Sequence, residues 1–380
     1  DIQLQEVESF HYPAKADIIG YKPRTQGHPM QIKKALQAIK EAERPIICCG
    51  GGVVLAGARE EMIAFARNSG IPVAATMMGI GVMPMDSPYY LGMIGSHGRT
   101  SANKAMSEAD LVILCGARVG DRAVAAPESL AEKAKIIHID IDPAEIGKNM
   151  TAHIPIVGDI RLVLSELAAK VENNVSQDWI DRVFGLKAKY PPRGEAREDC
   201  VEPRVFIRDL SAMMKEDAIL AADVGQNQIW AARNFNVKEG RFLTSGGLGT
   251  MGYSVPAAIG AKIAKPHRQV VAVCGDGSFQ MCMCELGTLI QNGVDIKIII
   301  MENQRLGMVR EFQDRLYGCR HIGTVLEHGN PDFVKLAESY GIEAARAENN
   351  AQAKELAQHM LQSNKAFILV CSVDPEIPSI

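Results

Sequence analysis

Short apolar runs of strand length alternate with helical segments along most of this 380-residue chain, and this alternation constrains its fold. Runs such as 44–49, 110–115 and 268–274 are rich in apolar residues and end at glycines, whereas several of the segments between such runs have helical spacing. Because a strand, a helix and a further strand form a right-handed crossover, the pattern predicts parallel sheets. We therefore expect an α/β protein with two tandem doubly wound domains.

The alternation is interrupted twice, which predicts the domain organisation. We expect a linker over 1–27, a first nucleotide-type domain over 28–167, a linker over 168–202 and a second domain over 203–380. A helix is predicted from Phe279 to about Gln291. The predicted strands are 44–49, 72–76, 110–115 and 135–141 in the first domain, and 218–222, 268–274, 295–301 and 366–373 in the second.

Composition excludes several classes of protein. Hydrophobic residues make up 47% and charged residues 23%, with a formal net charge of −4, which indicates neither a nucleic-acid surface nor a disordered chain. No apolar stretch approaches the roughly 20 residues that span a bilayer, so no membrane contact is expected. The nine cysteines form no Cys-x-x-Cys pair, which favours reduced thiols and a cytoplasmic location.

A Gly275-Asp276-Gly277-Ser278 turn follows one of the apolar runs and opens a helical segment. Such a turn directs backbone N–H groups toward an anion, but an aspartate within it would repel a phosphate. A divalent cation that bridges the carboxylate and the phosphate resolves this conflict. Asn303 follows the next apolar run and offers a second oxygen ligand, so the sequence predicts a magnesium and diphosphate site.

This pattern, closed by Asn303-Gln-Arg-Leu-Gly-Met308, resembles the thiamine-diphosphate motif of decarboxylases and carboligases. The resemblance implies that Asp276, Asn303 and the backbone carbonyl of Arg305 bind Mg²⁺. Two more segments, 223–230 and the glycine-dense 244–261, resemble the same family, which implies that Met251 holds the cofactor in a bent shape. The implied thiamine-diphosphate contacts are Val224, Gly225, Gln226, Asn227, Gly249, Met251, Gly275, Gly277, Ser278, Gly307 and Met308.

The first domain narrows the resemblance to acetohydroxyacid synthases, also called acetolactate synthases. Segments 91–98, 116–122, 138–147 and 157–159 resemble, in that order, the flavin-binding middle domain of these enzymes. The resemblance implies bound FAD and a substrate carboxylate held by Arg122. The implied FAD contacts are Gly51, Thr76, His97, Gly116, Arg118, Asp140 and Asp159.

Several positions depart from the family pattern. Asn227 stands where many members carry histidine, and Arg118-Val-Gly-Asp-Arg122 replaces the usual Arg-Phe-Asp-Asp-Arg. Phe312 stands where acetohydroxyacid synthases typically carry the tryptophan that contacts the second substrate. One reduced apolar contact is worth about 1–3 kcal/mol, so we expect a weaker preference for 2-ketobutyrate over pyruvate.

The resemblance as a whole implies an acetolactate synthase of branched-chain amino-acid biosynthesis, with Met251, Arg122 and Phe312 as its catalytic positions. It implies a homodimer or tetramer in which a partner subunit's N-terminal domain supplies a glutamate, and a possible regulatory small subunit. We therefore expect residues 1–380 to be inactive alone. The alternatives are a flavin-free catabolic acetolactate synthase, a pyruvate oxidase, a glyoxylate carboligase, or a nucleotide-binding module without catalysis.

Overall fold

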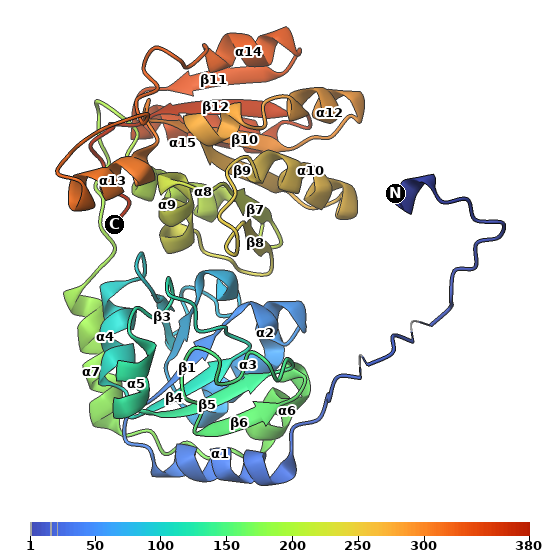
Figure 1. Cartoon of the computed structure of the whole chain (residues 1–380). Helices are drawn as coiled ribbons and strands as arrows, with labels where there is room; N and C mark the ends of the chain where they lie inside the picture. The colour runs from blue at the N-terminus through green and yellow to red at the C-terminus, as the bar shows by residue number, and fades with distance from the viewer. Residues whose placement is uncertain (1, 16, 21) are drawn as a thin grey trace.

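A computed structural model of the chain describes residues 2–15, 17–20 and 22–380. Two α/β domains follow one another, each built around a six-stranded sheet (Figure 1). Every strand pairing within the two sheets is parallel. The expected fold class of two tandem doubly wound domains is confirmed.

The first sheet has the strand order β3-β2-β1-β4-β5-β6. Its central strands are buried on both faces, as parallel strands covered by helices must be. Helices α1, α3 and α6 pack on one face, and α4, α5 and α7 on the other. The elements are β1 Pro45–Cys49, β2 Val73–Ala75, β3 Tyr90–Met93, β4 Leu111–Cys115, β5 Lys135–Asp140, β6 Ile154–Val157, α1 Pro29–Glu41, α2 Gly51–Leu55, α3 Arg59–Ser69, η2 Met77–Gly79, α4 Thr100–Glu108, α5 Pro127–Lys133, α6 Ile160–Lys170 and α7 Gln177–Lys189.

The second sheet has the order β11-β12-β10-β9-β7-β8. Helices α8, α9 and α15 cover one face, and α10, α12 and α14 cover the other. The elements are β7 Ile219–Ala222, β8 Arg241–Thr244, β9 Val270–Gly275, β10 Lys297–Glu302, β11 Glu343–Ala347, β12 Phe367–Ser372, α8 Pro203–Met213, α9 Gln226–Asn234, α10 Ser254–Ala264, α11 Asp276–Gln280, α12 Glu285–Gln291, α13 Gly307–Leu316, α14 Phe333–Ser339 and α15 Asn350–Gln362.

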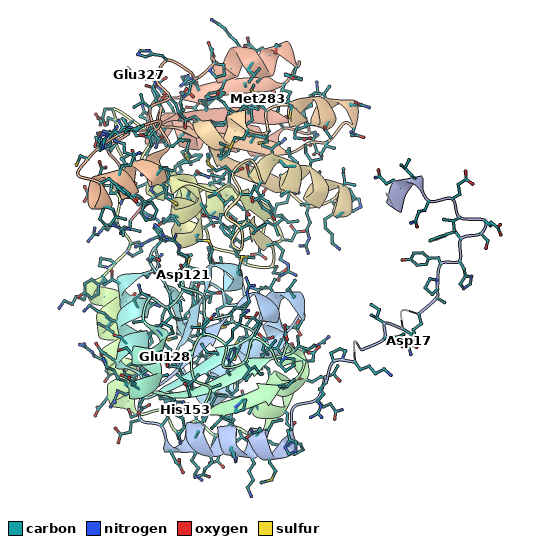
Figure 2. The ribbon with its side chains drawn as sticks, viewed as in Figure 1. Asp17, Asp121, Glu128, His153, Met283 and Glu327 are labelled. Carbon is teal, nitrogen blue, oxygen red and sulfur yellow. The ribbon has the colours of Figure 1, made fainter. Side chains whose placement is uncertain are left out.

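The segments outside the two sheets differ in how they pack. The described residues before α1 form only a short 3₁₀ helix, η1 Ile2–Leu4, and most of them extend away from both domains (Figure 1). Thr25 returns to the first domain, where its backbone oxygen accepts a hydrogen bond from Asp159 N at 2.6 Å. Helix α7, which precedes the crossing to the second domain, buries Trp179, Val183 and Leu186 against the first sheet. The carboxyl ends of the first sheet face the second domain, since Asp121 lies at that end and His153 at the opposite one (Figure 2).

Two local expectations need correction. The helix expected from Phe279 to Gln291 is divided into α11 and α12, because the turn at Met281–Cys284 forms hydrogen bonds to the third residue back, such as Cys282 N to Phe279 O. Residues 307–316, expected to belong to a loop, form α13, and none of its side chains is buried. All eight strands expected from the sequence are confirmed, with ends shifted by one or two residues.

Candidate functional site

Three strand ends meet at one edge of the second sheet and carry the polar motifs. Strand β7 ends before Asp223, β9 leads directly into Asp276, and β10 ends before Asn303. Because β9 pairs in parallel with both β7 and β10, the residues that follow these strands are neighbours. Ligands bind at this edge in open α/β sheets, beyond the carboxyl ends of the strands.

A pocket at this edge contains most of the positions expected to bind thiamine diphosphate and Mg²⁺. Gly249 lies on the same loop as Met251 but is exposed and does not line the pocket. Four further lining residues were not expected from the sequence: Trp230, Met301, Leu306 and Val309. The expected residues that line it are Val224, Gly225, Gln226, Asn227, Met251, Gly275, Asp276, Gly277, Ser278, Asn303, Arg305, Gly307 and Met308.

The Asp276 carboxylate is buried and is held by neutral donors. Its Oδ2 accepts hydrogen bonds from Gln304 N at 2.7 Å and Asn330 Nδ2 at 2.8 Å, and its Oδ1 accepts one from Gly277 N at 3.0 Å. Burial raises the pKa of Asp276 to about 6, and these hydrogen bonds only partly oppose that shift. A carboxylate in this environment favours a bound cation.

Asn303 is oriented by a chain of polar side chains, all of which are buried except the half-buried Glu311. Its Nδ2 donates to Gln226 Oε1 at 2.7 Å, and Gln226 Nε2 donates to Glu311 Oε1 at 2.7 Å. Glu311 also accepts hydrogen bonds from the backbone N and the hydroxyl of Ser379, at 2.7 and 2.6 Å. The chain fixes the amide so that Asn303 Oδ1 faces its own loop, where it accepts from Arg305 N at 3.2 Å.

Two positions in the pocket require glycine, one for its backbone angle and one for a close contact with this chain. Gly225 has a φ of 142° at the start of α9, a conformation that residues with a β-carbon rarely adopt. A β-carbon at Gly307 would lie 1.8 Å from Gln226 Oε1 and 3.0 Å from Asn303 Nδ2. Glycine at 307 is therefore required by the packing of the Asn303 side chain.

Asp223 holds the glycine-dense loop that carries Met251. Its fully buried carboxylate accepts hydrogen bonds from Gly252 N at 2.9 Å and Ser254 N at 2.7 Å. The sequence pattern places Asp223 in a motif but assigns no role to this residue. Asp223 nevertheless follows β7 as directly as Asp276 follows β9. Asn330 was missed altogether because it comes from a distant loop with no motif of its own.

The Asp276 carboxylate has no free cation beside it among the described residues that line the pocket. Arg305 is the one cationic residue among those of the described chain that line the pocket, and its guanidinium is paired with Glu376 at 2.9 Å. Within the described ranges, no three His, Cys, Asp or Glu side chains gather where they could hold a metal ion. A metal here would thus depend on one carboxylate together with amide and carbonyl oxygens, a donor set that suits Mg²⁺.

The positions expected to contact FAD lie at the carboxyl ends of the first sheet. Gly51, Thr76, His97, Asp140 and Asp159 follow or end five different strands. Gly116 and Arg118 follow β4, and the Arg118 side chain is exposed. Gly50 and Gly52 pack against Gly116, where a β-carbon would clash with its backbone.

Two of the expected catalytic positions come together across the domains. The guanidinium of Arg122, from the first domain, lies 5.8 Å from the centre of the Phe312 ring on α13. Arg315 lies over the same ring at 5.1 Å. Neither Arg122 nor Phe312 lines the pocket that contains Asp276 and Met251.

Comparison with known families identifies both domains. Residues 32–167 match the family described as thiamine pyrophosphate enzyme, central domain. Residues 223–371 match the thiamine pyrophosphate enzyme, C-terminal TPP binding domain. The chain therefore belongs to the thiamine pyrophosphate enzymes.

Relatives within this family carry one recurring name. The chain is 45% identical over 384 residues to a probable acetolactate synthase large subunit of Methanocaldococcus jannaschii, covering 97% of this chain and 64% of the relative. It is 42% identical over 395 residues to a probable acetolactate synthase large subunit of Methanococcus aeolicus, with coverages of 99% and 66%. It is also 42% identical over 381 residues to the acetolactate synthase large subunit of Corynebacterium glutamicum, with coverages of 97% and 60%. The chain thus spans just under two thirds of the length of these curated relatives.

Proposed function

We propose that the chain is the central and C-terminal part of an acetolactate synthase large subunit. The whole enzyme would decarboxylate pyruvate and join the two-carbon unit to pyruvate or 2-ketobutyrate, in the biosynthesis of branched-chain amino acids. The observation that carries the proposal is the meeting of Asp276 and Asn303 in one pocket with Met251. The proposal is supported by the 45% sequence identity between this chain and a probable acetolactate synthase large subunit.

Bound thiamine diphosphate would supply the carbanion-stabilising chemistry, and the protein would hold and orient it. Met251 would support the bent cofactor from a loop that Asp223 fixes in place. Arg122 would hold a substrate carboxylate, and Phe312 would contact the second substrate from its place beside Arg122. The pocket wall formed by Gly275, Gly277 and Ser278 would receive the diphosphate.

Mg²⁺ would be bound by Asp276, Asn303 and the carbonyl of Arg305. Two features support this metal site. The Asp276 carboxylate is buried and has only neutral donors around it, and Arg305, the one cation among the described residues that line the pocket, is paired with Glu376. A diphosphate and a buried carboxylate repel one another, and a divalent ion between them would neutralise both.

FAD would bind along the carboxyl ends of the first sheet, at Gly51, Thr76, His97, Gly116, Arg118, Asp140 and Asp159. Their common placement at one sheet edge supports this assignment. The exposed Arg118 guanidinium would be available to an anionic group.

The complete enzyme would be a cytoplasmic homodimer or tetramer, with a possible regulatory small subunit. No helix in the described part of the chain is long and apolar enough to cross a membrane. Among the described residues that line the pocket there is no glutamate, and nearby Glu311 is engaged by Gln226 and Ser379. A glutamate for the cofactor's pyrimidine would come from a partner subunit's N-terminal domain, so residues 1–380 alone should form no acetolactate.

The test is Asp276→Asn in the full-length enzyme. Acetolactate formation from pyruvate should fall at least a hundredfold, and calorimetry should detect weaker binding of thiamine diphosphate in the presence of Mg²⁺. Asp178→Asn, an exposed position in the first turn of α7, is the matched control and should leave both measurements unchanged.

The products distinguish the alternatives. A full-length wild-type enzyme that forms hydrogen peroxide or acetyl phosphate would be a pyruvate oxidase, and one that acts only on glyoxylate would be a glyoxylate carboligase. Acetolactate formation without bound flavin would indicate the catabolic type. Unchanged cofactor binding in Asp276→Asn would exclude the proposed metal site.

A further inference from the structure

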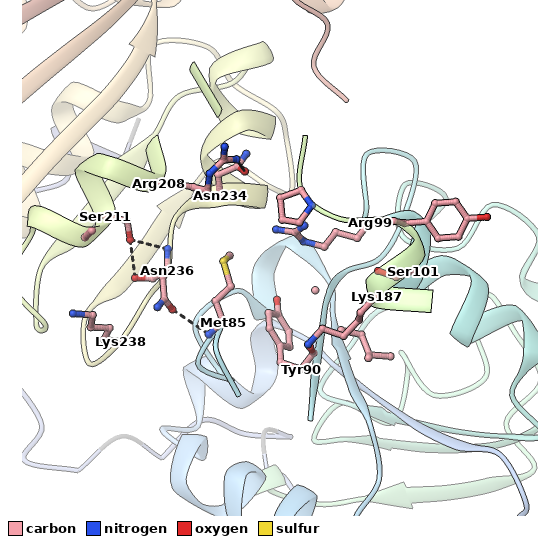
Figure 3. A pocket seen from close by; sticks show the side chains of 15 residues that line it. Met85, Tyr90, Arg99, Ser101, Lys187, Arg208, Ser211, Asn234, Asn236 and Lys238 are labelled. Carbon is pink, nitrogen blue, oxygen red and sulfur yellow. Dashed lines mark hydrogen bonds between the residues drawn. The ribbon is translucent and has the colours of Figure 1, made fainter. Parts of the chain in front are cut away.

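A large cavity lies between the two domains, beside the edge strand β3 of the first sheet. Its volume is about 510 Å³, within the range of small-molecule sites. Its walls come from β3 and α7 of the first domain, α8 and the end of α9 of the second, and the segment near Pro192 that joins them (Figure 3). None of its lining residues belongs to the pocket that contains Asp276.

Four cationic side chains line this cavity: Arg99, Lys187, Arg208 and Lys238. They come from both domains, with Arg99 and Lys187 on one side and Arg208 and Lys238 on the other (Figure 3). None of the described residues that line it carries a carboxylate. The cavity is therefore strongly positive.

Three of these cations have no acidic partner within 4.0 Å among the residues that the structure describes. Lys187 Nζ donates to Tyr90 O at 2.9 Å, and Arg99 donates to the backbone oxygen of Arg233. Arg208 donates to Asn234 Oδ1 at 3.1 Å and to backbone oxygens of the joining segment. In the part of the chain that the structure describes, no carboxylate lies within 4.0 Å of these three charges. Only Lys238 has one, the exposed Glu216 at 3.8 Å.

The three charges are partly buried and repel one another. Burial lowers the pKa of Arg99, Lys187 and Arg208. Arg208 further lowers the pKa of Arg99, and Arg99 that of Lys187, whereas Glu202 and Asp209 act on Arg208 in the opposite direction. Several cations that are partly removed from water and lie close together raise the free energy of the folded protein unless an anion compensates their charge. Phosphate is a suitable anion, because a guanidinium group can donate two parallel hydrogen bonds to its oxygens.

The cavity also has a less polar side, formed by Met85 and the buried ring of Tyr90. Met85 N donates to Asn236 Oδ1 at 3.1 Å, which ties this side to the second domain. Asn236 N in turn donates to Ser211 Oγ at 2.9 Å, so the wall is held in place (Figure 3). A ligand with an anionic end and a flat apolar part would fill both sides.

We propose that this cavity binds a phosphate group, carried by a phosphate monoester of about nucleotide size. Arg99 and Arg208 would contact the phosphate from opposite domains, and Lys187 and Lys238 would add charge at its sides. A ligand held in this way would bridge the two domains.

Calorimetry on the full-length enzyme tests the proposal, with AMP and inorganic phosphate as probes at constant ionic strength. Thiamine diphosphate and Mg²⁺ are kept in excess so that the diphosphate loop is occupied. AMP should bind saturably and inorganic phosphate more weakly, because only AMP reaches the side formed by Met85 and Tyr90. Equal affinity for both probes would assign the site to free phosphate and keep the anion-binding role.

The variants separate this site from any other. The double variant Arg99→Gln, Arg208→Gln should weaken AMP binding at least tenfold, whereas Arg67→Gln, an exposed position on α3, should not change it. AMP should raise the melting temperature of the wild type and of Arg67→Gln, but not that of the double variant. If the double variant does not fold, the single variant Lys187→Gln should also weaken AMP binding, but by a smaller factor. Absence of saturable binding to the wild type, or undiminished binding to a folded double variant, would overturn the proposal.

Discussion

At the scale of single residues, the site depends on positions where no side chain is tolerated. Gly307 is the clearest of them, since a β-carbon would meet the Gln226 amide that orients Asn303. We expect Gly307→Ala to displace Gln226, to destabilise the folded chain by about 1–3 kcal/mol, and to weaken binding of thiamine diphosphate with Mg²⁺. Urea unfolding and calorimetry measure the two effects.

The control for this substitution is Gly185→Ala in α7, where a β-carbon would meet nothing within 4 Å. It should be neutral or slightly stabilising, because alanine favours a helix interior over glycine by up to about 1 kcal/mol. Cofactor affinity equal in both variants would show that the close contact at Gly307 can be relieved without moving Asn303.

At the scale of elements, the two sheets bury most of the cysteines. Cys48, Cys49, Cys115, Cys274 and Cys371 lie on central strands, and burial raises the pKa of each thiol. A buried thiol with a raised pKa provides little thiolate for alkylation. The described cysteines that are exposed are Cys284 and Cys319.

Iodoacetamide at pH 8 should therefore label Cys284 and Cys319 in the native protein, and the other seven only after unfolding in guanidinium. Peptide mapping by mass spectrometry measures the labelling at each position. Native labelling of Cys274 at a rate similar to that of Cys284 would mean that the second sheet opens readily.

The sequence predicted the inner strands of both sheets but not the outer ones. The four strands missed, β3, β6, β8 and β11, are the four edges of the two sheets. Central strands of a parallel sheet are buried on both faces and appear as continuous apolar runs, whereas the edge strand Glu343–Ala347 is partly exposed and carries Glu343 and Arg346. Their pairing depends on the neighbouring strand, which a local pattern does not contain.

The candidate site was predicted where a motif follows a strand, as at Asp276 and Asn303. Its supporting contacts were not, since Asn330, Glu311 and Ser379 reach the site from loops and from the C-terminal segment. The interdomain cavity is also not encoded by any local motif, because its cations are 139 positions apart from Arg99 to Lys238 (238 − 99). Tertiary packing alone brings them together.

At the scale of the whole molecule, hydrogen bonds join the domains near this cavity. Arg233 Nη1, from the second domain, donates to His97 O at 3.1 Å and to Gly98 O at 2.9 Å in the first. A charged donor to a backbone oxygen contributes about 1.5–3 kcal/mol, so loss of the Arg233 guanidinium should weaken the coupling of the domains. The bonds from Arg99 to Arg233 O and from Met85 N to Asn236 Oδ1 would remain. The chain's two tryptophans report on this separately, because Trp179 is buried in the first domain and Trp230 in the second.

We expect the two domains of the wild type to unfold together in urea, because the contacts made by Arg233 make separate unfolding costly. Fluorescence of Trp179→Phe and Trp230→Phe variants follows one domain at a time, and their transitions should coincide. In an Arg233→Ala background the two transitions should separate, while the exposed control Arg67→Ala should keep them together. Transitions that are already separate with Arg233 intact would show that the domains are only loosely joined, and a ligand bridging the cavity would then be expected to bring them together.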